Sequence, residues 1–111
     1  MFGSDKKKIS LKPTPFLATI AGQDYRFAAL SLKEWEQQVE AEAAAVKAND
    51  RVKLLDLHRQ VVLVALTKGG NDVSMDELVE MDVPLFQAIF SAVMQAHGMK
   101  LEAKVGEASP L

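Results

Sequence analysis

The chain has 111 residues, of which 49% are hydrophobic and 25% charged, and its formal net charge is −2. This size and composition predict one soluble globular domain and argue against wholesale disorder. The absence of cysteine excludes disulfides and thiolate chemistry, and the charge gives no reason to expect nucleic acid as a partner. The longest apolar run, residues 61–66, is far shorter than the ~20 residues of a membrane span. We therefore expect a cytoplasmic protein that does not bind membranes.

The first part of the chain combines an arm with a hairpin. Residues 1–15 contain three consecutive lysines and two prolines, which favour a flexible, extended arm. Residues 16–28 consist of a short apolar run, the turn Ala21-Gly22-Gln23-Asp24 and an aromatic strand, a pattern that predicts a β-hairpin. Because an isolated hairpin is marginally stable in water, we expect it to pack on an apolar surface or to pair with a second copy. The second option leaves a homo-oligomer open.

Two long helices are predicted next. Ser31-Leu32-Lys33-Glu34 has the pattern of a capping box and predicts a helix over 32–48. Its apolar residues recur at three- and four-residue steps and form one stripe: Leu32, Trp35, Val39, Ala43 and Val46. Asp50 is suited to cap a second helix over 51–68, which Gly69-Gly70 ends. The second half of this helix is apolar on every side, so we expect it to be central.

Two further helices complete the predicted fold. The capping box Ser74-Met75-Asp76-Glu77 predicts a helix over 75–81, and Pro84 suits the first turn of a last helix over 84–97. Residues 99–111 show little periodicity and predict a loose C-terminal tail. The expected fold class is mainly α, with an N-terminal β-hairpin followed by a small bundle of about four helices, in a single domain over residues 16–98.

The sequence gives no indication of catalysis or of a cofactor. The two histidines, His58 and His97, fall on different predicted helices, and neither has a carboxylate at ligand spacing, so we expect no metal site. Nucleophile and phosphate-binding motifs are absent. The helices over 75–81 and 84–97 imitate a helix-turn-helix, but the second has no lysine or arginine with which to read DNA. We therefore expect a protein that is not an enzyme and does not bind nucleic acid.

Protein–protein interaction remains as the expected role. Four of the five methionines lie in the last third of the chain, and methionine is common on surfaces that accept several partners. The last predicted helix also has two phenylalanines one turn apart. The alternative is that these side chains fill the core. Our candidates for partner binding are Phe86, Phe90, Met94, Met81 and Met75.

Parts of the chain resemble the tail assembly chaperones of long-tailed (siphovirus-type) bacteriophages and prophages. The resemblance lies in four segments, which read ATI (18–20), GQDYRF (22–27), LSLKEW (30–35) and VSMDEL (73–78). It implies a non-catalytic protein of the host bacterial cytoplasm that binds the tape-measure protein and helps the tail-tube protein to polymerise. In many members of that family a ribosomal frameshift appends a second domain, and residues 99–111 would then be the unshifted ending. Two alternatives stay open, namely a structural virion component (a head–tail joining or tail-completion protein) and a small regulatory adaptor.

Overall fold

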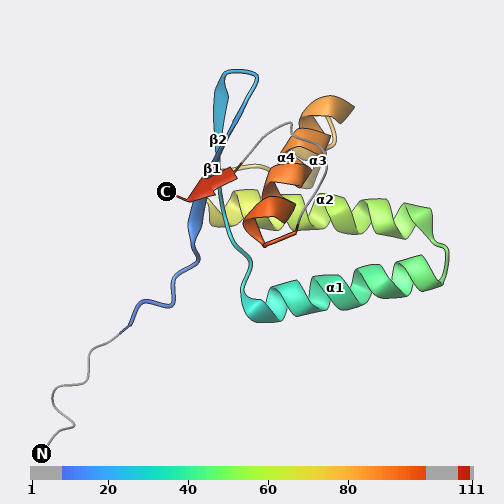
Figure 1. Ribbon diagram of the computed structural model, residues 1–111. Coiled ribbons are helices and arrows are strands. Elements are labelled where there is room, and N and C mark those ends of the chain that lie inside the picture. The colour runs from blue at the N-terminus through green and yellow to red at the C-terminus, as the bar shows by residue number, and fades with distance from the viewer. Residues whose placement is uncertain (1–8, 100–107, 111) are drawn as a thin grey trace, which may run out of the picture.

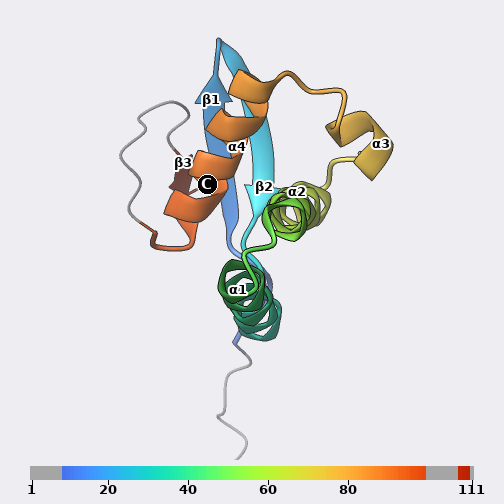
Figure 2. The same ribbon diagram turned by 90° about the vertical axis from the view of Figure 1, so that its right-hand side faces the viewer.

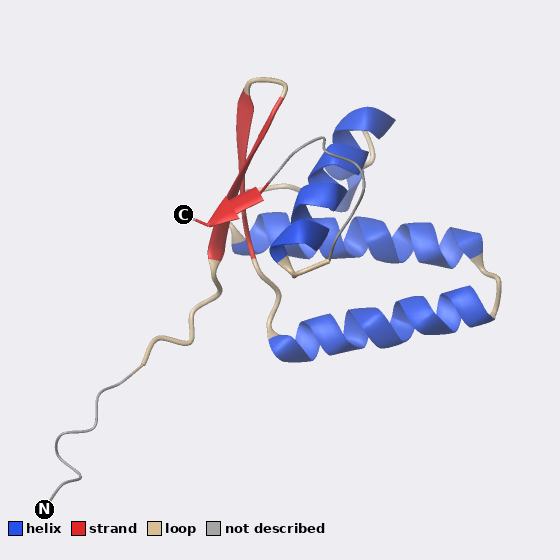
Figure 3. Cartoon of the chain, viewed as in Figure 1, coloured by secondary structure: helices blue, strands red, loops and turns tan. Residues whose placement is uncertain are grey.

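The computed structural model of the chain describes residues 9–99 and 108–110 (Figure 1). A hairpin of β1 (Pro15–Ile20) and β2 (Gln23–Ala28) is followed by α1 (Leu32–Lys47), α2 (Arg51–Lys68), α3 (Met75–Leu78) and α4 (Val83–Ala96), and β3 (Ala108–Pro110) comes last. Helices make up most of the described chain (Figure 3). The predicted fold class, mainly α with an N-terminal hairpin followed by four helices, is confirmed.

The sheet has a third strand that the sequence did not predict. β1 pairs antiparallel with both β2 and β3, which gives the strand order β2-β1-β3. In this register Ala18 of β1 lies between Tyr25 of β2 and Ala108 of β3. The prediction of a loose tail over 99–111 is therefore wrong for residues 108–110, because the open edge of β1 offers backbone groups with which they pair. Residues 100–107 and 111, like residues 1–8 of the predicted arm, lie outside the described residues.

The helices begin where their capping residues stand. The side chains of Ser31, Asp50, Ser74 and Asp82 each accept a hydrogen bond from the backbone N–H three residues later. α3 is shorter than predicted, ending at Leu78 instead of residue 81. Beyond it the backbone continues in tighter three-residue turns, with the N–H of Glu80 and of Met81 donating to the third carbonyl before each.

The core lies between one face of the sheet, the C-terminal half of α2, and α4. Figure 2 shows α4 lying along the sheet with α2 beside it. The largest fully buried side chains come from β2, α2, α3 and α4: Phe27, Val61, Val62, Leu78, Ile89 and Val93. α1 supplies no residue to this buried cluster and packs along α2 instead. It is therefore a peripheral helix, held by α2 and by Trp35, which packs against the cluster from outside.

The C-terminal end of α2 is pressed against β2. A Cβ atom added to Gly69 would lie only 2.4 Å from the Cα of Phe27, so no larger residue fits without a backbone shift. The side-chain amide of Asn71 donates to the carbonyl oxygens of both Arg26 in β2 and Leu66 in α2. These contacts fix the position of α2 on the sheet and hence the geometry of the surface between α2 and α4.

Candidate functional site

An open apolar groove runs between α2, the segment that follows α3, and α4. Its volume is about 470 Å³. The apolar side chains on its walls come from all three parts of the chain: Leu55, Val79, Met81, Val83, Phe86 and Phe90. Leu78, which is 1% exposed, forms part of its floor and belongs to the core as well. The groove is thus a surface feature built directly on the packed interior.

The structure divides the five predicted binding residues into two groups. Met81, Phe86 and Phe90 line the groove and are partly buried. Met94 is 5% exposed and lies in the core, so it is not available to a partner. Met75 packs against the core and does not line the groove. The groove therefore contains only part of the last-helix face that the sequence suggested.

Three exposed apolar side chains of the groove were not among the predicted residues. Leu55 is 56% exposed, Val79 52% and Val83 66%. Sequence periodicity does not identify such residues, because it marks a helix face without showing whether that face is covered. A position near the end of one helix or the start of another gives only a weak indication that a side chain lines a groove. These residues form the solvent-facing rim of the groove.

Aromatic contacts fix the wall opposite this rim. The rings of Phe86 and Phe90 stack with centroids 6.3 Å apart and planes 14° apart. His58 of α2 lies against Phe90 at a centroid distance of 4.4 Å, and its Nε2 lies 3.5 Å from a carboxylate oxygen of Glu42 in α1. Each ring is held from at least one side, so the groove is formed in advance of any binding.

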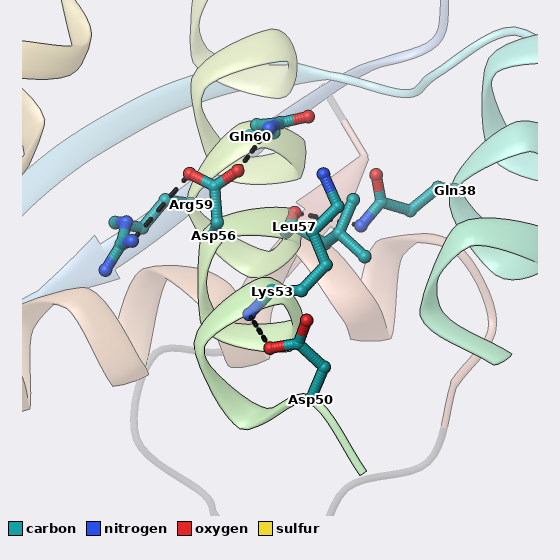
Figure 4. A network of polar contacts seen from close by, with 7 residues as sticks. All are labelled: Gln38, Asp50, Lys53, Asp56, Leu57, Arg59 and Gln60. Carbon is teal, nitrogen blue, oxygen red and sulfur yellow. Dashed lines mark hydrogen bonds and ion pairs between the residues drawn. The ribbon is translucent and has the colours of Figure 1, made fainter. Parts of the chain in front are cut away.

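Arg59 of the groove belongs to a set of polar contacts along α2. Figure 4 shows the carboxylate of Asp56 between Arg59 and Gln60: Arg59 Nη2 lies 3.7 Å from Oδ1, and Gln60 Nε2 donates to Oδ2 over 2.6 Å. The same view shows Gln38 of α1 donating to the carbonyl oxygen of Leu57 over 2.9 Å. Arg59 is thus the cationic group on the rim. His58 and Gln87 are the other polar residues of a lining that is mostly apolar and suits apolar side chains of another molecule.

Among the described residues, one carboxylate has a clearly lowered pKa, and it lies away from the groove. The backbone N–H of Ser31, and then the ammonium group of Lys68 at 2.9 Å, lower the pKa of Glu34 below its ordinary value of 4.5. Both contacts stabilise the ionised form. This carboxylate completes the capping box of α1 and links that helix to the end of α2, so its role is structural.

Within residues 9–99 and 108–110, no three side chains of the metal-binding types His, Cys, Asp and Glu come together as a possible site. In the same part of the chain, no helix has the length and apolar character needed to cross a bilayer. Comparisons with protein-family models, with characterised proteins and with solved structures found no significant match. The groove and its residues are thus the basis for any assignment of function.

Proposed function

We propose that this protein is a tail assembly chaperone of a long-tailed phage or prophage. It acts in the host bacterial cytoplasm and binds an apolar, helical segment of the tape-measure protein in the groove between α2 and α4. The observation that carries the proposal is the open groove itself, because a preformed apolar trough on a small protein suits an amphipathic helix of a client. Together with the resemblance in sequence, the groove favours a holding role over a catalytic one.

The exposed apolar side chains of the groove set the binding free energy expected of this contact. Full burial of a valine or leucine side chain contributes about 1.5–3 kcal/mol. Leu55, Val79 and Val83 are between 52% and 66% exposed, so a client that covers them gains roughly 1 kcal/mol from each. A charge placed at two of these positions should therefore lower affinity by at least about tenfold, since tenfold corresponds to about 1.4 kcal/mol.

The experiment is co-expression with the tape-measure protein of the same phage, followed by pull-down and a solubility assay. The wild-type chain should keep the client soluble and co-purify with it. The variant Leu55→Glu/Val83→Glu should lose this activity while its circular dichroism stays that of the wild type. Val83 is the first residue of α4, where a negative charge suits the helix dipole.

A matched control variant is Ile9→Glu/Leu11→Glu. Both side chains are exposed, at 78% and 86%, and both lie on the arm, so the same change of charge and hydrophobicity is made away from the groove. This control should retain the client. If the client stays insoluble with the wild type and nothing co-purifies, the chaperone proposal is wrong. If the groove variant works as well as the control, the binding site has been misplaced.

A further inference from the structure

α1 presents an apolar stripe to the outside of the molecule. Leu32, Val39 and Val46 are 74%, 50% and 64% exposed. They are seven residues apart, so they lie on one face of the helix. The face turned toward α2 contains Gln38 and Ala45 instead: Gln38 donates to the carbonyl oxygen of Leu57, and Ala45 is the buried residue of α1. Leu32, Val39 and Val46 therefore lie largely uncovered within the part of the chain that the structure describes, whereas Trp35 is partly buried.

The acidic residues of α1 also differ between its two sides: those that face α2 have partners among the described residues, and those that face outward have none there. On the side of α2, Glu34 pairs with Lys68 and Glu42 lies 3.5 Å from His58. On the outer side, Glu36 and Glu40 are exposed and make no ion pair with any described residue. They stand one turn apart, an arrangement that is unfavourable for an isolated helix because the charges repel each other. A cation from outside the chain would remove that repulsion.

Trp35 joins the apolar stripe and the two outer acids into one surface. A shallow hollow on α1 is lined by Leu32, Trp35, Glu36, Val39 and Glu40. The indole stacks on the ring of His97, with centroids 4.6 Å and planes 7° apart. His97 is itself fixed, because Nε2 accepts from the N–H of Leu30 and Nδ1 therefore carries the proton donated to the carbonyl oxygen of Val93. The surface is thus held in a defined shape.

We propose that this outer face of α1 binds a basic amphipathic helix of a partner protein. Apolar residues of the partner, spaced by three and four, cover Leu32, Trp35 and Val39, and its flanking lysines or arginines pair with Glu36 and Glu40. A second copy of the chain fits poorly. Its α1 would bring a second Glu36 and Glu40 to the same face, which adds negative charge where the exposed acids call for positive charge. None of these residues lines the groove between α2 and α4, so this proposal does not depend on the function proposed above.

A synthetic helix tests the proposal on the full chain. The probe is a peptide of about three heptads with leucine at the two core positions, lysine at the flanking positions and no aromatic residue. Its counterpart has glutamate in place of lysine. Trp35 is the chain's single tryptophan, so its fluorescence reports binding at this face. The lysine peptide should bind at least about tenfold more tightly than the glutamate peptide, and added salt should reduce the difference.

Variants locate the binding site. Glu36→Lys/Glu40→Lys should weaken the lysine peptide by about tenfold or more, and Val39→Asp should weaken both peptides. The double variant Asp72→Lys/Glu80→Lys makes the same change of net charge at exposed positions elsewhere, and it should bind as the wild type does. Equal weakening by this control would show unspecific attraction and overturn the proposal.

Two other results would also contradict it. If Leu55→Glu/Val83→Glu abolishes peptide binding while Val39→Asp does not, the peptide occupies the groove and the outer face of α1 is not its site. If sedimentation shows a dimer that Val39→Asp converts to a monomer, the face is covered by a second copy. Circular dichroism of each variant establishes that it is folded, which the exposure of Val39 makes the expected result.

Discussion

Truncation of Met94 should destabilise the protein without removing any contact to a client. Met94 was a candidate for partner binding, but its side chain is 5% exposed and belongs to the buried cluster between the sheet, α2 and α4. Replacement of a buried methionine by alanine typically costs about 2–5 kcal/mol, because the transfer energy is lost and a cavity remains. Met94→Ala should therefore lower the midpoint of thermal unfolding by roughly 8 °C or more.

Urea unfolding followed by circular dichroism measures this loss, and Met94→Leu serves as the control. The leucine variant keeps the side-chain volume, so we expect it to lose less than about 1.5 kcal/mol and to bind the client as the wild type does. The reasoning is refuted if Met94→Ala unfolds within about 0.5 kcal/mol of the wild type. It is refuted equally if the folded Met94→Leu variant no longer binds. The first result would remove Met94 from the core, and the second would place it on the binding surface.

Three further predictions concern the frame that holds the groove. Gly69→Ala should cost about 1–3 kcal/mol in urea unfolding, because the added Cβ meets the backbone of Phe27 and cannot be accommodated by a rotamer change. Ser74→Ala should lower the free energy of unfolding by about 1 kcal/mol, because α3 loses its cap. A loss near zero would exclude a structural role for that capping box. Since the pKa of Glu34 is lower in the folded state, its ionised form stabilises the fold above pH 4.5 and this contribution is lost as the pH falls through the folded-state pKa. The stability difference between the wild type and Glu34→Gln should accordingly shrink in acid unfolding experiments; a difference independent of pH would contradict the assignment.

The helix starts could be predicted because capping is local chemistry. Ser31 and Glu34 are three residues apart, as are Ser74 and Glu77, and each pair satisfies its own backbone groups without help from the rest of the chain. The pattern is therefore visible in four letters of sequence. Helix ends are harder, since α3 passes into tighter turns after Leu78 without any residue that marks the change.

The third strand could not be predicted because its partner is distant. Residues 108–110 pair with residues 16–18, and the short segment Ala-Ser-Pro has none of the β-branched or aromatic residues typical of strands. Proline is tolerated there because β3 is an edge strand. Pairing of this kind depends on which edge of the hairpin is open and which distant segment reaches it, and neither is visible in a local sequence pattern.

The candidate groove was predicted only in part: the sequence indicated Met81 and residues of α4, but none of α2. Phe86 and Phe90 are one helical turn apart, so the sequence alone places them on one face of the last helix. The opposite wall depends on how α2 and α4 cross, and nothing in the sequence specifies that Leu55 lies near them. The same limit explains Met94, which shares the pattern of Phe86 and Phe90 but lies further along α4, where the helix is covered by the core.

The way in which α1 is attached to α2 is the strongest physical indication that its outer face binds another molecule. An amphipathic helix in a hairpin would normally turn its leucines and valines toward its neighbour, because their burial contributes most to stability. Here α1 instead faces α2 with the small residue Ala45, an ion pair of Glu34 with Lys68 and a hydrogen bond of Gln38. Leu32, Val39 and Val46 stay exposed. Single exposed apolar residues are ordinary on protein surfaces, but three aligned on one helix forgo stability that the opposite orientation would provide. A surface kept for another molecule accounts for that loss.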